Sequence, residues 1–125
     1  MTLSKDNKFV TVDVMNWQIE YYNQKLEEQI LNLPDGLLAR YLRLTDLMLE
    51  FGSNLGLPHT KPIGNNLFEL RVKSKEGIAR VFFCTKIGRK IIMLHSFVKQ
   101  SQKTPKKELK IANSRMSKVM KDETF

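Results

Sequence analysis

The chain of 125 residues contains a single cysteine, Cys84, so it cannot form an internal disulfide. It also lacks a long apolar run. The longest on a candidate strand is Ile91–Leu94, whereas a membrane-spanning helix needs about 18 apolar residues. The first eight residues are mostly polar, which argues against a secretory signal peptide. Together these absences predict a cytoplasmic protein, held in a reducing environment and without membrane segments.

The motifs of several enzyme classes are missing as well. The sequence has no glycine-rich phosphate-binding loop, no HExxH zinc motif, no pair of cysteines spaced for zinc and no GxSxG turn. Its two histidines and one cysteine could hold a metal only with several carboxylates, and carboxylates are few in the C-terminal half. We therefore expect no metal site and no cofactor.

Positive charge is abundant, and it is unevenly distributed. Residues 1–66 hold 6 Lys and Arg against 8 Asp and Glu, while residues 67–125 hold 15 against 5, which gives net charges of −2 and +10. A segregated positive field attracts polyanions, because their binding releases counterions from phosphates. The pattern indicates a nucleic acid or an acidic protein as partner. The alternative is a solvated basic face without a ligand.

The N-terminal half predicts one strand and two helices. Trp17, Ile19 and Tyr21 alternate with polar residues, which predicts a strand that begins near Met15. A helix capped by Asn23 should run to Pro34, and a second should span residues 35–51 and end at Gly52. The prolines and glycines of residues 52–66 predict a loop without strand pairing.

The C-terminal half predicts three strands and a basic helix. The strands span residues 67–73, 78–85 and 90–98, and their short connections favour an antiparallel meander. Thr104 should cap the last helix, with Pro105 as its first residue. The sequence thus predicts an α+β domain of order β-α-α-β-β-β-α, with the helices packed on one face of a small antiparallel sheet. This domain covers residues 15–125, and residues 1–14 form an extension that is either disordered or an upstream mis-start.

The strand periodicity separates apolar from basic side chains. Phe68, Leu70 and Val72 should face the core, so Arg71 and Lys73 should project together from the other face. Arg80 and Phe82 should lie on that same open face, where cations could bind phosphate and the ring could stack on a base. The alternative is that Arg80 pairs with Glu69 and that Phe82 belongs to the core.

Three segments of the chain resemble a known family. They are Leu67-Phe68-Glu69-Leu70-Arg71, Gly77-Ile78-Ala79-Arg80-Val81-Phe82-Phe83 and the stretch from Leu94 to Glu108, which includes Phe97-Val98-Lys99 and Lys103-Thr104-Pro105. They are similar to the HigB-like, phage-derived branch of the RelE toxin superfamily, and the resemblance runs from about Asn16 to Lys121. It implies a RelE-like fold and the toxin of a type II toxin–antitoxin system, a ribosome-dependent mRNA endonuclease.

The resemblance also implies roles for individual residues. Metal-free cleavage by the 2′-hydroxyl requires proton transfers and stabilisation of charge on the phosphate. The catalytic candidates are Arg71, Arg80, Lys99 and Lys103, and the candidates for holding RNA are Lys73, Phe82, Lys106 and Lys107. His95 lies within an apolar strand, so it is either a buried, hydrogen-bonded histidine or a catalytic one.

The implied partners are a helix-turn-helix antitoxin, the ribosome and mRNA, with an oligomer formed through the antitoxin and no contact with a membrane. The acid and base are the residues that the resemblance leaves unassigned. A second interpretation therefore stays open, in which the same scaffold is a basic RNA- or protein-binding module without catalytic activity.

Overall fold

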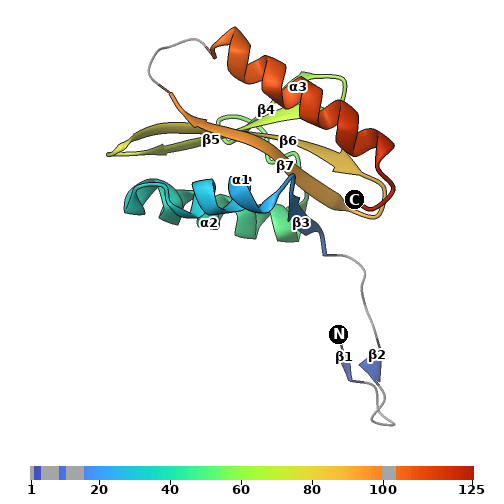
Figure 1. Cartoon of the computed structure of the whole chain (residues 1–125). Helices are drawn as coiled ribbons and strands as arrows, with labels where there is room; N and C mark the ends of the chain where they lie inside the picture. The colour runs from blue at the N-terminus through green and yellow to red at the C-terminus, as the bar shows by residue number, and fades with distance from the viewer. Residues whose placement is uncertain (1, 4–8, 11–15, 100–103) are drawn as a thin grey trace.

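A five-stranded mixed sheet forms the centre of the molecule in the computed structural model, which describes residues 2–3, 9–10, 16–99 and 104–125 (Figure 1). The strands are β3 (Gln18–Tyr21), β4 (Thr60–Gly64), β5 (Leu67–Ser74), β6 (Gly77–Lys86) and β7 (Lys90–Val98), in the spatial order β3-β7-β6-β5-β4. Strands β5, β6 and β7 form the predicted antiparallel meander. Two short strands, β1 (Thr2–Leu3) and β2 (Phe9–Val10), pair with each other in a separate sheet.

Three helices accompany the sheet: α1 (Gln24–Leu31), α2 (Asp35–Phe51) and α3 (Lys106–Lys121). The Asn23 side chain accepts a hydrogen bond of 2.8 Å from the Leu26 amide, which confirms the predicted cap of α1. Gly52 ends α2 with a φ of +101°, a conformation that favours glycine. None of the helices in the described part of the chain is long and apolar enough to cross a membrane.

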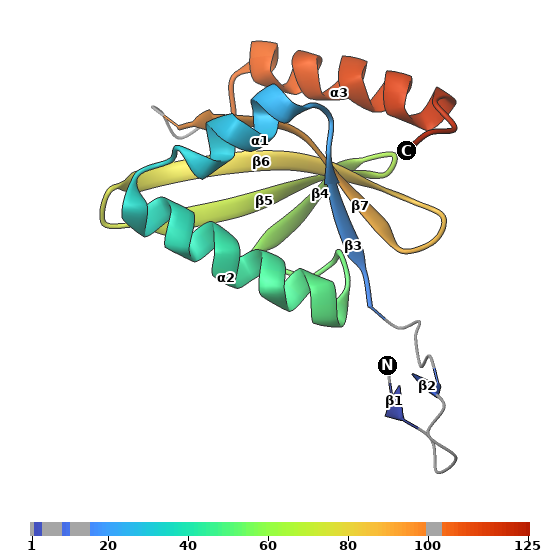
Figure 2. The same cartoon turned by 60° about the horizontal axis from the view of Figure 1, so that its bottom comes forward.

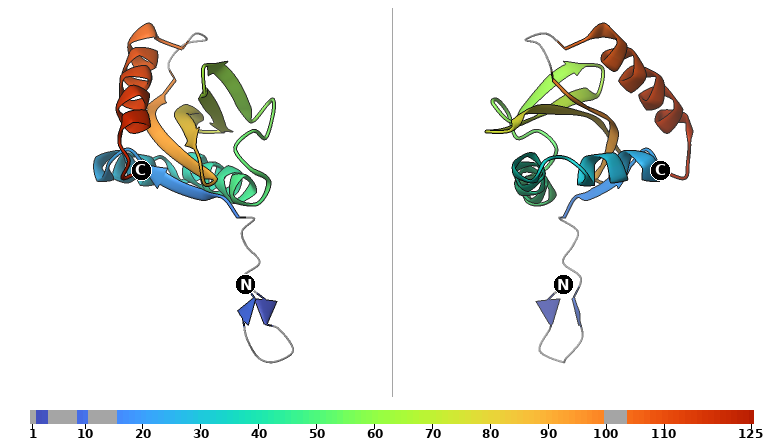
Figure 3. Two further views of the ribbon diagram at one scale, coloured as in Figure 1. Left: turned by 90° about the vertical axis from the view of Figure 1, so that its right-hand side faces the viewer. Right: turned by 60° about the vertical axis from the view of Figure 1, so that its left-hand side comes forward.

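The helices cover both faces of the sheet, so the prediction that they pack on one face is wrong. Helices α1 and α2 lie on one side and α3 on the other, as Figures 1 and 3 show. Each side has its own core: one contains Leu26, Tyr41, Leu70, Val81 and Phe83, and the other Leu67, Phe82, Ile92, Leu94 and Val119. The reason is that β6 and β7 carry apolar residues on both faces, and both faces need a cover.

Three further predictions about local structure are wrong. Residues 60–64 form β4, which pairs with β5, where the sequence predicts an unpaired loop. Pro62 is tolerated there because β4 is an edge strand. The first core strand, β3, runs parallel to β7, so the sheet is mixed rather than antiparallel. The N-cap of α3 is Pro105, and the Thr104 hydroxyl donates to Glu69 instead of capping the helix.

Helix α2 runs obliquely across the sheet, as Figure 2 shows. Its N-terminus is capped by a side chain that is distant in the sequence. The Glu76 carboxylate, in the β5–β6 turn, accepts hydrogen bonds from the backbone amides of Gly36 and Leu37. A carboxylate at this end satisfies free amides and complements the helix dipole. The contact fixes the β5–β6 hairpin against α2.

Candidate functional site

Four basic side chains converge on the α3 side of the sheet, and we call them the cationic cluster: Lys61, Arg71, Arg80 and Lys99. Lys61 lies on β4, Arg71 on β5 and Arg80 on β6, while Lys99 follows β7. Arg71 lies opposite Arg80 across the β5–β6 pair, and Lys61 lies opposite Glu69 across the β4–β5 pair. Residues that face each other across antiparallel strands project on the same side of the sheet. The strand register therefore gathers charges that are far apart in the sequence.

Glu69 lies among these cations. Its Oε1 is 3.3 Å from Arg80 Nε and 3.9 Å from Arg71 Nε. Its Oε2 accepts a hydrogen bond of 3.0 Å from the Thr104 hydroxyl. The Glu69–Arg80 ion pair suggested by one of the two sequence interpretations is therefore present.

Arg80 is the most buried member of the cationic cluster, with a side chain that is 5% exposed, against 35% for Arg71. The prediction that Arg80 lies on an open face is therefore wrong, because its side chain is enclosed beside Glu69. Burial lowers the pKa of the Arg80 guanidinium, the Glu69 carboxylate opposes this change, and the neighbouring Arg71 adds to it. The Nη1 group donates to the Ala79 carbonyl at 3.4 Å. The buried Nε has no hydrogen-bond partner among the described residues, so the ion pair with Glu69 and the Nη1 contact are what orient this planar cation.

Lys99 is half-buried where the chain leaves β7, and its backbone amide donates to the Ile78 carbonyl at 2.7 Å. Its amine has a lowered pKa. Desolvation is the main cause, Arg80, Arg71 and Lys61 add to it, and Glu69 opposes it. A lowered pKa makes it easier for the amine to give up a proton. Of the four predicted catalytic residues, Arg71, Arg80 and Lys99 thus lie together, while Lys103 falls outside the described residues.

Phe82 does not face solvent, so the prediction that its ring lies on an open face is wrong. The residue shares a sheet face with Arg80, but α3 covers this part of the face and Phe82 is 0% exposed. Its ring stacks on Phe97 with centroids 5.9 Å apart. The interpretation of Phe82 as a core residue is the one that the structure supports, and a buried ring cannot stack on a base.

His95 is held by a carboxylate from α3. Its Nε2 lies 2.8 Å from Glu108 Oε1, and the two side chains are 12% and 15% exposed. The imidazole also stacks on Phe97, with centroids 6.3 Å apart. Of the two interpretations of this residue, the hydrogen-bonded, largely buried histidine agrees with the structure. The contact attaches the first turn of α3 to β7.

The predicted RNA-holding lysines are exposed but lie on two different elements. Lys73 follows Arg71 on the same face of β5, where it is exposed. Lys106 and Lys107 are exposed in the first turn of α3. None of the three takes part in the contacts around Glu69 described above. Their place is therefore around the cationic cluster rather than within it.

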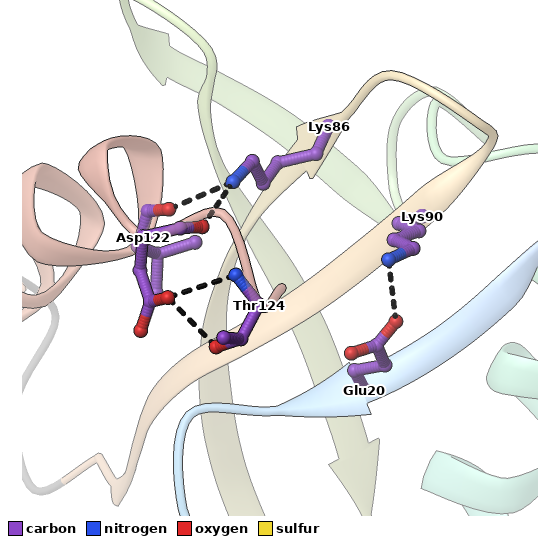
Figure 4. A network of polar contacts seen from close by, with 6 residues as sticks. Glu20, Lys86, Lys90, Asp122 and Thr124 are labelled. Carbon is purple, nitrogen blue, oxygen red and sulfur yellow. Dashed lines mark hydrogen bonds and ion pairs between the residues drawn. The ribbon is translucent and has the colours of Figure 1, made fainter.

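The far end of α3 is fixed as well (Figure 4). The Lys86 amine donates to the backbone carbonyls of Val119 and Asp122, at 3.0 and 2.8 Å. The Asp122 carboxylate in turn accepts hydrogen bonds from the backbone amide and hydroxyl of Thr124. Midway along the helix, Arg115 donates to the Leu94 carbonyl at 2.9 Å. These contacts hold α3 over the sheet along its whole length.

Sequence reasoning gave Glu69 only the part of a partner for Arg80, and it missed Lys61 and Thr104. Lys61 lies in a segment that the sequence predicts to be a loop, and the sequence predicts Thr104 to be a helix cap. One available signal was the apolar stretch Val81–Cys84, in which both faces of a strand are hydrophobic. It indicates a second covering layer, and hence that residues near the start of the last helix approach the basic face.

Among the described residues, no three His, Cys, Asp or Glu side chains are grouped as metal ligands would be.

Comparison with known proteins identifies a family. A search of curated proteins finds no match. A family model described as "Phage derived protein Gp49-like (DUF891)" matches residues 28–117. The matched region includes α2, the sheet strands β4 to β7 and most of α3, so it contains the whole cationic cluster. The match suggests a toxin-like module. Since it covers well over half of the chain, the protein belongs to the phage-derived Gp49-like family.

Proposed function

We propose that the protein is the toxin of a type II toxin–antitoxin pair, of the HigB-like branch of the RelE superfamily, and cleaves mRNA on the ribosome without a metal. The observation that carries the proposal is the convergence of Arg71, Arg80 and Lys99 on one sheet face. Membership in the phage-derived Gp49-like family supports a toxin-like role. The resemblance of the strand and loop sequences to HigB-like toxins supports the specific activity.

The reaction is an attack of a ribose 2′-oxygen on the adjacent phosphorus. The new bond joins that oxygen to phosphorus, the bond to the 5′-oxygen breaks, and the products are a 2′,3′-cyclic phosphate and a 5′-hydroxyl. Arg71 and Arg80 stabilise the negative charge that grows on the phosphate oxygens, and electrostatic stabilisation of this kind is usually the largest single term in catalysis. Lys99 and Lys103 move the protons, one from the 2′-hydroxyl and one to the leaving 5′-oxygen.

The exposed lysines supply attraction for RNA. Lys73 extends the basic face of β5, and Lys106 and Lys107 present further charge at the start of α3. Contacts of this kind make affinity for the ribosome and its mRNA fall steeply as salt rises. A helix-turn-helix antitoxin is the proposed inhibitor, which would cover the cationic cluster or block entry to the ribosome, and the complex would be an oligomer.

A second candidate function is a basic binding module without catalytic activity. One observation favours it: the imidazole of His95, a side chain that often serves as general acid or base, is 2.8 Å from the Glu108 carboxylate and largely buried. In this case the cationic cluster would bind RNA or an acidic protein, and no cleavage would follow.

The test is to express the protein alone and follow growth and mRNA integrity, with and without the neighbouring open reading frame. We expect growth arrest with cleavage at translated codons, and rescue by the neighbouring gene product. Arg71→Ala should lower the cleavage rate by about 100- to 1,000-fold, and its partly exposed side chain makes it a safe substitution for folding. The matched control is Arg43→Ala, an exposed arginine on α2. Intact mRNA together with salt-dependent RNA binding would favour the second candidate.

A further inference from the structure

Glu69 is a carboxylate buried in the most basic part of the molecule, with 4% of its surface exposed. Burial of a charged group is costly unless every part of it is paired. Both carboxylate oxygens have partners here: Oε1 faces the two arginines, and Oε2 accepts from Thr104. Both oxygens of Glu69 thus face groups of the protein itself. Its role must therefore be exercised through the groups that it contacts.

The first such group is the arginine pair. Arg71 and Arg80 are directly opposed across β5 and β6. Like charges in this position repel each other and destabilise the strand pair. Glu69 Oε1 contacts the Nε of both, at 3.9 and 3.3 Å. The carboxylate thus acts as the shared counterion that lets two guanidinium groups stand side by side.

The second effect concerns the orientation of Arg80. Its Nε faces Glu69 Oε1, and its Nη1 faces the Ala79 carbonyl at 3.4 Å. Nε has no hydrogen-bond partner among the described residues, so the ion pair with Glu69 is its polar contact there. Because the guanidinium is planar, this ion pair and the Nη1 hydrogen bond together restrict the direction of the remaining nitrogen. We propose that Glu69 is a positioning residue, which aims Arg80 and keeps it beside Arg71 so that both arginines meet one RNA phosphate. The inference rests on the proposed endonuclease function.

Glu69 also connects the arginines to the chain before α3. The Thr104 hydroxyl donates to Oε2 at 3.0 Å, and Thr104 is the residue after Lys103. One carboxylate therefore holds two strands and the start of α3 in register. Loss of its charge should misplace the arginines even where the fold survives, and a displacement of about 1 Å at a reacting centre can cost as much as 100-fold in rate.

The main experiment compares Glu69→Gln with Glu20→Gln. Glu20 is the control, because it is an ion-paired carboxylate 3.5 Å from Lys90 and lies on β3, the edge strand farthest from β4 and β5 (Figure 4). For Glu69→Gln we expect kcat for cleavage to fall about 10- to 100-fold. Affinity for an uncleavable RNA with a 2′-deoxyribose at the cleavage position should stay equal or rise, because a negative charge has been removed. An unchanged kcat would overturn the proposal. So would a loss confined to kcat/KM that an equal loss of RNA affinity explains.

The pH profile supplies a readout that a merely structural role would not move. The Glu69 charge raises the pKa of Lys99, against the lowering by burial, Arg80, Arg71 and Lys61. Its removal should therefore shift the limb of the cleavage profile that depends on Lys99 to lower pH. A profile identical to that of the unmodified protein, in a folded Glu69→Gln protein, contradicts the assignment.

A second variant covers a failure of Glu69→Gln to fold. Thr104→Val keeps the charge and shape but removes one hydrogen bond, and should lower kcat by about 2- to 10-fold. The NMR signal of the Arg80 Nε–H group separates this proposal from the proposed function. Slow hydrogen exchange in the unmodified protein that becomes fast in the Thr104→Val variant supports positioning even if the protein cleaves no RNA. Exchange equal in both proteins overturns positioning, whatever the activity.

Discussion

Replacing Phe82 with alanine tests whether this ring acts in the core or on RNA. The residue is 0% exposed, stacks on Phe97 and belongs to the cluster between the sheet and α3. Truncation of a buried phenylalanine costs about 3–5 kcal/mol, through lost burial and the cavity left behind. Folded domains have a total stability of about 5–15 kcal/mol. For a chain of this length the Tm should fall by roughly 10–20 °C.

The assay is urea unfolding followed by the fluorescence of Trp17, the single tryptophan, which packs against the opposite core. Phe82→Leu should lose much less stability, because it keeps most of the apolar volume. Phe51→Ala is the control, because Phe51 is 69% exposed, and its free energy of unfolding should stay within about 0.5 kcal/mol of the unmodified protein. RNA affinity of the folded Phe82→Leu protein should match that of the unmodified protein.

The opposite pattern would refute this reasoning. If Phe82→Ala keeps the Tm of the unmodified protein and instead binds RNA several-fold more weakly, the ring acts by stacking on a base, and α3 does not cover it in solution. A fall in both stability and affinity is resolved with Phe82→Leu. Weak RNA binding by that stable variant would also count against a purely structural role.

Four other predictions follow from local contacts. Glu76→Ala should cost about 1 kcal/mol through loss of the α2 cap, measured as a Tm lower by a few degrees, while Lys75→Ala should not change the Tm. Burial raises the pKa of the Cys84 thiol to about 11, so at pH 8 the thiol is protonated and should react with a thiol reagent only after unfolding. His95→Gln should lower the Tm clearly and change the cleavage rate little, because it loosens the contact with Glu108. A chain without residues 1–14 should keep its Tm within about 2 °C, because β1 and β2 pair apart from the main sheet.

Local patterns in the sequence determined the elements that depend on neighbouring residues. Helix α2 spans the predicted residues 35–51, and α1 begins after the predicted cap at Asn23. Strands β5, β6 and β7 lie within a residue or two of their predicted bounds, because alternation and short turns are local signals. The same alternation correctly placed Arg71 and Arg80 on one face, since side chains along a strand point to alternate sides.

Tertiary structure alone decided the features that depend on distant segments. The parallel pairing of β3 with β7 joins residues some 70 positions apart, and no local pattern encodes it. The pairing of β4 depends on its place at an edge, where proline is tolerated. Helix α3 could have covered either face by its own periodicity. It packs over β6 and β7 because their second apolar face must be removed from water, and this burial turns Phe82 from a candidate RNA contact into a core residue.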